Sequence, residues 1–241
     1  MSLHDKTMLI TGASQGIGRY LSVYFGRRCK NVIGIARSEA GLAQTAQEAR
    51  EDDARFEGIV ADLSDPSSLV RLYEQLTHQN ESIDILIHNA ADVTSKSFAA
   101  TSLSEIERQV QTNITGPLQL TQLLLPSLLE SEAPSIVTMS SLAGYKANPT
   151  QTVYSATKTA VNGIAQALRT EFAPQGVHVL NVALSSVALR DEARPGAVPV
   201  AEFAQSLERA LHQRQDELYL SGASKWLMRM YQFYPPLGRV R

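Results

Sequence analysis

The chain has 241 residues, of which 44% are hydrophobic, and a formal net charge of −2. That length can bury a substantial core, and the nearly balanced charge argues against binding to nucleic acid or to an anionic membrane. No apolar run approaches the roughly 20 residues of a membrane span, and the N-terminus lacks the apolar stretch of a secretory signal, so we expect a cytoplasmic protein.

Short aliphatic runs with little polar alternation recur along the chain, as is typical of strands covered on both faces. We expect strands at Thr7–Thr11, Asn31–Ala36, Phe56–Ala61, Ile83–His88, Ser135–Ser140, Val177–Ala183 and Glu217–Leu220. Helical patterns lie between them, at Gly16–Arg28, Glu39–Asp52, Pro66–His78, Leu103–Asn113, Gly116–Ser131, Thr152–Ala173 and Val200–Gln213. This alternation predicts one α/β domain over residues 1–241, a Rossmann-like doubly wound parallel sheet of about seven strands with helices on both faces.

A glycine-rich turn, Thr11–Gly18, follows the first strand and opens the first helix. In that position a glycine motif predicts a site for the pyrophosphate of a dinucleotide, held by free N–H groups of the helix N-terminus. Gly12 would form the tight turn, Gly16 would admit the phosphate, and Gly18 would allow close helix packing. The cofactor-binding residues expected in this turn are Gly12, Ser14, Gln15, Gly16, Ile17 and Gly18. The alternative is a strand–helix connection without a ligand.

The second strand ends with Arg37 and Ser38, and no carboxylate occurs before Glu39. A carboxylate there would hold a ribose 2′-hydroxyl, whereas an arginine can pair with a 2′-phosphate. The sequence therefore predicts NADP(H) in preference to NAD(H), with Arg37 and Ser38 as cofactor-binding residues. The alternative for Arg37 is a solvated charge at the helix entry.

Tyr154 and Lys158 stand four residues apart in a predicted helix, so they share one face. A nearby ammonium favours phenolate, which predicts a Tyr154 pKa lowered from its reference of about 10. Such a tyrosine could act as general acid or base near neutral pH.

The single cysteine, Cys29, ends an apolar helical pattern and is expected to be structural. We expect no metal site.

With the glycine turn, Ser141, Tyr154 and Lys158 in this order and spacing, the chain resembles the short-chain dehydrogenase/reductase family from about Lys6 to Val187. The resemblance implies that Ser141 and Tyr154 are catalytic, Ser141 donating a hydrogen bond to the substrate oxygen and Tyr154 protonating it. Lys158 would keep the tyrosine acidic and hold the nicotinamide ribose. Asn113, the fourth catalytic residue, would hold a water in a proton relay.

The resemblance also implies further cofactor contacts. Asp62 and Leu63 would lie against the adenine, Asn89 and Ala90 along the ribose, and backbone of Val187 at the nicotinamide carboxamide.

Three segments depart from the family pattern. His88-Asn89-Ala90-Ala91 stands where the family often has Asn-Asn-Ala-Gly, and we interpret His88 as a packing residue. Leu184–Leu189 lacks the usual Pro-Gly and the threonine that follows it. The end of the chain lacks the usual glycine-rich section.

We expect Leu142, Ala143 and Tyr145 to line the substrate pocket beside Ser141. A variable lid is expected at residues 189–199. Within it, Arg190 or Arg194 could bind an anionic substrate, but a solvated loop is the favoured interpretation. Residues 224–241 form an aromatic segment expected to pack on its own domain or on a second subunit. The alternatives are peripheral contact with lipid and closure of the substrate pocket. The leucine-rich helix Gly116–Ser131, with the alanine-lined helix after Tyr154, resembles the family's dimer interface, so we expect a homodimer or homotetramer.

These features favour an NADP(H)-dependent oxidoreductase that transfers hydride between the nicotinamide and a carbonyl or alcohol, with Tyr154 as general acid/base. Two alternatives stay open from the sequence: a hydrolase or isomerase that uses the same Tyr/Lys site without redox chemistry, and a regulatory protein that senses NADPH.

Overall fold

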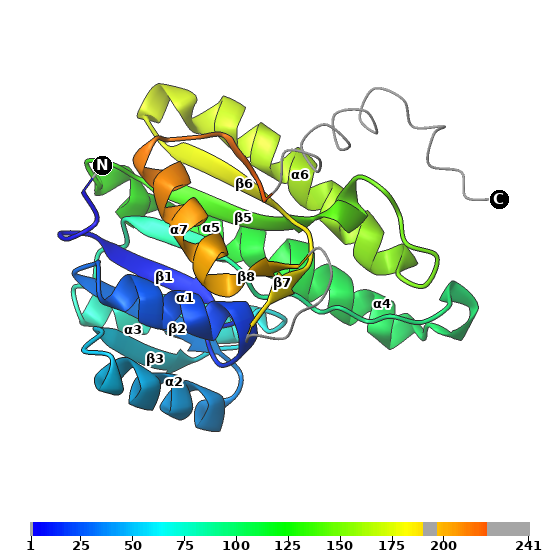
Figure 1. The fold of residues 1–241 in the computed structure, drawn as a ribbon, viewed down its shortest axis with the longest axis horizontal. Coiled ribbons are helices and arrows are strands. Elements are labelled where there is room, and N and C mark those ends of the chain that lie inside the picture. The colour runs from blue at the N-terminus through cyan, green and yellow to red at the C-terminus, as the bar shows by residue number, and fades with distance from the viewer. Residues whose placement is uncertain (1, 190–196, 221–241) are drawn as a thin grey trace.

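The fold is built on a parallel sheet of seven strands (Figure 1). The computed structural model describes residues 2–189 and 197–220. The strands are β1 (Thr7–Thr11), β2 (Asn31–Ala36), β3 (Phe56–Val60), β4 (Ile85–His88), β5 (Ser135–Ser141), β6 (His178–Leu184) and β9 (Glu217–Tyr219). Their order is β3-β2-β1-β4-β5-β6-β9, and every neighbouring pair is parallel. The predicted Rossmann-like sheet is confirmed.

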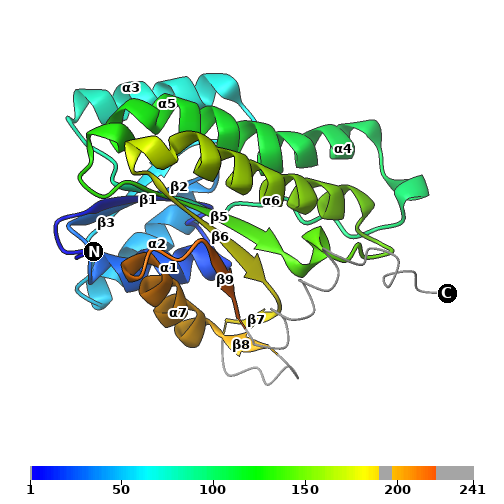
Figure 2. The same ribbon diagram turned by 90° about the horizontal axis from the view of Figure 1, so that it is seen from above.

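Helices cover both faces of this sheet (Figure 2). One face carries α1 (Gly16–Gly26), α2 (Glu39–Glu51) and α7 (Val200–His212). The other carries α3 (Pro66–His78), α4 (Leu103–Val110), α5 (Gly116–Glu130) and α6 (Thr152–Phe172). Each face buries its own apolar cluster, with Phe25 and Phe203 on the first and Leu69 and Leu124 on the second. Such two-sided cover accounts for the continuously apolar strands.

Local signals fix several helix starts. Asp65 caps α3 by accepting a hydrogen bond from the Ser67 N–H at 2.9 Å, and Pro66 occupies the first helical position, where its missing N–H costs nothing. Cys29 is buried in the cluster on the α1 side, as expected of a packing residue.

The helix expected at Leu103–Asn113 differs from the prediction at its C-terminal end. The helix expected to end at Asn113 instead continues through a π-helical turn, η2 (Gln111–Thr115), directly into α5. One extra residue in that turn changes the direction of the following side chains without breaking the helix. Short 3-10 turns occur at Phe98–Ala100, Leu142–Gly144 and Ala173–Gln175.

After β6 the chain forms an unexpected two-stranded ladder, in which β7 (Val187–Ala188) pairs with β8 (Val198–Pro199). Most of the predicted lid, residues 190–196, lies outside the described residues. This part includes Arg190 and Arg194. The aromatic segment 224–241 also lies outside the described residues. Among the helices that are described, none has the length and apolar character needed to cross a membrane.

Candidate active site

A groove of about 700 Å³ runs along the carboxyl ends of the central strands. In open α/β sheets this is the edge where ligands bind, beside the point at which the strand order reverses, here between β1 and β4. The predicted site residues that line the groove are Gly12, Ser14, Gln15, Gly16, Ile17, Gly18, Arg37, Ser38, Asp62, Leu63, Asn89, Ala90, Tyr154 and Lys158. Residues from five separate segments of the chain thus share one groove.

The glycine turn has the geometry that a phosphate cradle requires. Gly12 has φ of +72°, a conformation that other residues rarely adopt, and a Cβ at Gly18 would lie 2.2 Å from the Gly12 carbonyl oxygen. Among the described residues, a Cβ at Gly16 would meet Leu189 alone, at 3.9 Å. No side chain among the described residues caps the N-terminus of α1 at Gln15. The turn and the helix dipole therefore present open N–H groups that fit a pyrophosphate.

Thr11, which the sequence analysis missed, holds this turn against β4. Its hydroxyl oxygen accepts hydrogen bonds from the N–H of Asn89 at 3.0 Å and of Ala90 at 2.9 Å. The Asn89 amide in turn donates to the Thr11 carbonyl at 2.8 Å. Asn89 is thus occupied in joining the two strand ends that border the groove. The sequence signal that could have identified this role is the threonine at the start of the glycine-rich turn.

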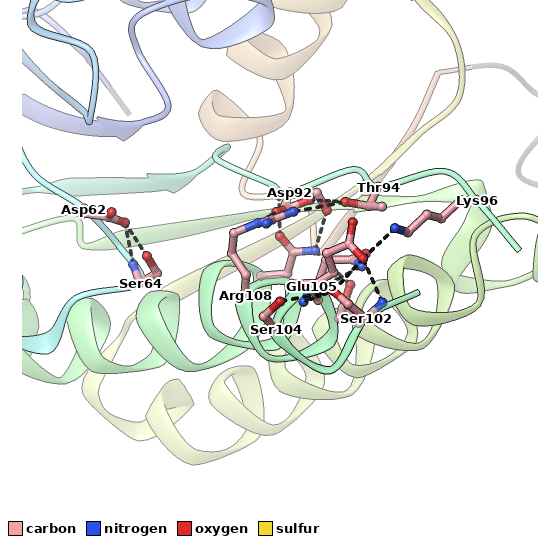
Figure 3. Close-up of polar contacts among 12 residues, drawn as sticks. Asp62, Ser64, Asp92, Thr94, Lys96, Ser102, Ser104, Glu105 and Arg108 are labelled. Atoms are coloured by element: carbon pink, nitrogen blue, oxygen red, sulfur yellow. Dashed lines mark hydrogen bonds and ion pairs between the residues drawn. The ribbon is translucent and has the colours of Figure 1, made fainter. Parts of the chain in front are cut away.

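Arg37, Ser38 and Asp62, expected to contact the adenosine part of a cofactor, all line the groove. The exposed Arg37 makes no hydrogen bond or ion pair with the other residues in the described part of the chain. The Ser38 hydroxyl oxygen caps α2 by accepting from the Gly41 N–H at 3.0 Å. The Asp62 carboxylate accepts from the N–H and hydroxyl of Ser64 at 2.8 and 2.7 Å (Figure 3). The Arg37 guanidinium is therefore available to an anionic ligand.

Tyr154 and Lys158 project from the first two turns of α6. The Lys158 Nζ lies 5.7 Å from the centre of the Tyr154 ring and donates a hydrogen bond to the Met139 carbonyl at 2.6 Å. Only 4% of Lys158 is exposed, and this burial lowers its pKa to about 8. A hydrogen bond also links Ser141 to the Tyr154 hydroxyl. The three side chains expected at the reacting centre are therefore adjacent.

The expected direction of the Tyr154 pKa shift is wrong. Burial raises the pKa of Tyr154 above its ordinary value, and the hydrogen bond with Ser141 lowers it by less. The spacing of Tyr154 and Lys158 indicates their proximity but not their burial, and loss of water disfavours phenolate. Tyr154 is accordingly a neutral phenol at neutral pH, suited to donating a proton.

Asn113 lies in the π-helical turn, 3% exposed. Its Oδ1 accepts from the Asp92 N–H at 2.7 Å, and its Nδ2 donates to the Asp92 carbonyl at 3.0 Å and to the Thr157 hydroxyl at 3.1 Å. The side chain is thus engaged in joining the segment after β4 to α6, close to Lys158. It does not line the groove among the described residues.

Two ion pairs fasten this same segment to α4 (Figure 3). Arg108 Nε lies 2.5 Å from the Asp92 carboxylate, and Lys96 Nζ lies 2.6 Å from the Glu105 carboxylate. Asp92 is therefore held through its backbone by Asn113 and through its side chain by Arg108. One wall of the groove gains a fixed position in this way.

Val187 and the three residues expected at the substrate pocket do not line the groove in the described part of the chain. Val187 lies in β7 and is not among the described residues that line the groove, whereas Leu184, Val93 and Thr112, which the sequence analysis did not select, do line it. Tyr145, expected at the substrate pocket, hydrogen-bonds instead with Tyr219 and Asn181. Leu142 and Ala143 are also absent from the described lining of the groove.

Comparison with known sequences identifies relatives. The sequence profile described as short chain dehydrogenase matches residues 6–192. The ketoacyl reductase HetN of Nostoc sp. is 36% identical over 178 residues, 74% of this chain and 62% of that protein. The chain therefore spans less than two thirds of the length of HetN. The oxidoreductase UcpA of Escherichia coli is 34% identical over 178 residues, 73% of this chain and 67% of that protein.

Solved structures share the whole fold. A short-chain dehydrogenase from Sphingobium yanoikuyae in complex with NADPH superposes with a TM-score of 0.82 at 27% identity, covering 98% of this chain and 96% of its own. The bulky-bulky ketone specific alcohol dehydrogenase from Comamonas testosteroni gives 0.81 at 27% identity, with 98% and 95% covered. The chain belongs to the short-chain dehydrogenase/reductase family.

Proposed function

We propose that the protein is an NADP(H)-dependent carbonyl reductase, or the reverse alcohol dehydrogenase, acting on a small to medium, partly apolar substrate. The observation that carries this proposal is that Tyr154 and Lys158 line the same groove as the glycine turn and Arg37. Phosphate recognition and proton transfer are thereby combined in one site. The names of the relatives HetN, a ketoacyl reductase, and the Comamonas ketone-specific enzyme support a carbonyl substrate.

The roles of the residues at the reacting centre follow from the charge that develops on the substrate oxygen. The nicotinamide supplies or accepts the hydride when bound. The carbonyl oxygen then gains negative charge, and the Ser141 hydroxyl would donate a hydrogen bond to it while Tyr154 gives up its phenolic proton. The raised Tyr154 pKa keeps the phenol protonated until the transfer. Lys158, charged below its pKa of about 8, would stabilise the phenolate that the transfer leaves behind.

The preference for NADP(H) rests on Arg37. Its exposed guanidinium lines the groove beside Ser38, at the N-terminus of α2. A 2′-phosphate there would meet a fork of donors and a helix N-terminus, and both favour an anion. The Sphingobium enzyme, whose structure was solved in complex with NADPH, supports the same cofactor.

The first test replaces Tyr154 by Phe and measures NADPH oxidation against a panel of ketones and aldehydes. We expect the wild type to turn over at least one class of carbonyl. The variant should lose about 10²- to 10⁴-fold in kcat, the usual contribution of a general acid, while still binding NADPH. Binding without oxidation in the wild type would indicate a sensor. Ester cleavage without nucleotide would indicate a hydrolase.

The second test replaces Arg37 by Asp, with Arg50→Asp, an exposed residue of α2, as the matched control. The Arg37 variant should raise the Kd for NADPH at least tenfold, because an ion pair becomes a repulsion, and should leave NADH binding within about twofold. Titration of nucleotide fluorescence measures both constants. Equal losses for the two nucleotides would contradict the role of Arg37.

A further inference from the structure

Two carbonyl groups of the glycine-rich turn, those of Ala13 and Ser14, are bound by side chains that the sequence analysis did not select. The Arg19 guanidinium donates through Nη2 to the Ser14 carbonyl at 2.5 Å. The Thr45 hydroxyl shares its hydrogen between the Ala13 carbonyl at 2.9 Å and the Gly41 carbonyl at 3.0 Å. Because Arg19 belongs to α1 and Thr45 to α2, two helices hold this short stretch of backbone.

These hydrogen bonds turn the two carbonyl oxygens away from the groove. Ser14 lines the groove, whereas Arg19 and Thr45 are not among its described lining residues, so the carbonyls point to the opposite side of the turn. A carbonyl oxygen that faced the groove would repel the phosphates of a nucleotide, since both carry negative charge. In a trans peptide the N–H points opposite to the C=O, so the same bonds also direct the N–H groups of Ser14 and Gln15.

Arg19 occupies a position that helix electrostatics alone disfavours. It is the fourth residue of α1, close to the end where the helix dipole is positive and repels a cation. Its Nη1 pairs with Glu48 of α2 at 3.1 Å, but 40% of that glutamate side chain is exposed to water, which weakens the pair. Its Nε is buried and has no hydrogen-bond partner among the described residues. A cation held here at a cost to stability is typical of a group retained for binding.

Apolar packing attaches the turn to α2 independently of these polar contacts. Ala13 is fully buried in a small cluster with Ala36 and Leu42. A Cβ at Gly41 would lie 2.7 Å from the Cβ of Ser14, so the backbone of α2 lies directly against the turn. Loss of the Arg19 guanidinium therefore leaves the position of α2 to this packing, and it changes the direction of the peptide groups in the turn.

From these contacts we infer that Arg19, assisted by Thr45, is a positioning residue for the pyrophosphate of the nucleotide. The two side chains hold the Ala13 and Ser14 carbonyls away from the groove before the nucleotide arrives, so binding does not have to reorder the turn. The guanidinium also adds positive charge behind the turn. This role rests on the proposed function in one respect, that the groove binds a dinucleotide. It concerns the pyrophosphate that NADPH and NADH share, whereas Arg37 concerns the 2′-phosphate.

The test compares Arg19→Met, which removes the guanidinium from a long side chain, with Arg19→Lys, whose ammonium can still donate to the Ser14 carbonyl. Thr45→Val removes the hydroxyl with little change in shape. Arg28→Met is the matched control, because Arg28 also donates to a backbone carbonyl, that of Tyr24, and pairs with a glutamate, but follows the other end of α1. Isothermal titration calorimetry measures the Kd for NADPH, for NADH and for adenosine 2′-phosphate, which lacks the pyrophosphate.

We expect Arg19→Met to raise the Kd for NADPH and the Kd for NADH by the same factor, about tenfold, the equivalent of one lost hydrogen bond to a charged group. Thr45→Val should raise both constants about threefold, and Arg19→Lys should recover most of the loss. Binding of adenosine 2′-phosphate should change by less than about twofold in each variant, and Arg28→Met should leave all three constants at their wild-type values.

An unchanged Kd for NADH in Arg19→Met would overturn the inference. An equal loss of affinity for adenosine 2′-phosphate would overturn it as well, because Arg19 would then support the groove as a whole rather than the pyrophosphate site. Arg37→Asp should give the opposite pattern, with losses for NADPH and adenosine 2′-phosphate but not for NADH. These readouts are binding constants, so a wild type that binds both nucleotides without turnover would contradict only the proposed function.

Discussion

Lys158 brings a positive charge to a position where 4% of its surface stays exposed. The pKa of about 8, against 10.5 for an exposed lysine, means that the fold is less stable with this ammonium charged than with it neutral. No acidic side chain contributes to that shift, which burial alone causes. Such a cost is typical of residues retained for activity.

Replacement of Lys158 by Met should therefore abolish turnover and stabilise the fold. At pH 7 the gain in the free energy of unfolding should be on the order of 2–3 kcal/mol, the size of the pKa difference less the lost hydrogen bond to Met139. Between pH 8 and 10.5 the unfolded wild type binds more protons than the folded one, so wild-type stability rises and the gain shrinks.

Urea unfolding of both proteins at pH 7 and pH 10 measures this difference, with Lys30→Met, an exposed lysine, as control. A Met variant that is less stable than the wild type at pH 7 would show that Lys158 supports the fold rather than straining it.

The sequence predicts that two residues are close together where their spacing within one helix is enough to determine it. Tyr154 and Lys158 are neighbours because a helix puts positions four apart on one face. The rise in the Tyr154 pKa was not predictable, because it depends on how much water the rest of the chain removes. The contacts of His88 with Thr121 and of Asn113 with Thr157 also escaped prediction, since each joins segments far apart in the chain.

At the scale of the elements, Gly16 and Gly18 in the turn between β1 and α1 have different roles. A Cβ at Gly18 would meet backbone at 2.2 Å, whereas at Gly16 the nearest atom is a leucine methyl group at 3.9 Å. Gly18 thus serves the packing of α1, and Gly16 keeps space open in the groove. The two positions form a natural matched pair.

We expect Gly18→Ala to lower the melting temperature of the nucleotide-free protein by several degrees, since the backbone must shift by more than side-chain motion allows. Gly16→Ala should cost only about 1–2 kcal/mol for its φ of +58° but should weaken NADPH binding at least tenfold. Differential scanning calorimetry and fluorescence titration measure the two effects. If both variants lost stability and affinity equally, the assignment of separate tasks would be wrong.

Most strands were predictable because buried parallel strands are continuously apolar and short. The π-helical turn at Gln111–Thr115 was not, because a single added residue leaves the hydrophobic periodicity on either side intact. The β7–β8 ladder escaped for another reason, since two residues on each side are too few to form a pattern.

For the whole molecule, the order of elements predicts the sheet, and the sheet predicts the location of the groove. Sequential β–α units in right-handed crossovers leave one point where the strand order reverses, and the loops after β1 and β4 meet there. The glycine turn, Asn89 and the Tyr154–Lys158 pair of α6 therefore converge on a single edge. No comparable rule predicts whether the chain packs against a second copy, or through which surface.

The expectation of a homodimer or homotetramer stays a prediction, and α5 offers the place to test it. Leu118 and Leu129 are 38% and 42% exposed, and their separation of three helical turns puts them on one face. Burial of such a face in a second subunit would account for apolar side chains there.

Light scattering should give a mass of two or four times the 26.3 kDa of one chain. The double change Leu118→Lys and Leu129→Lys should reduce it to one chain, because two charges would be buried without partners. Val70→Lys, at a 45% exposed position of α3, is the control and should leave the assembly intact. A wild type of one chain mass at micromolar concentration would overturn the prediction, and an unchanged double variant would move the interface away from this face of α5.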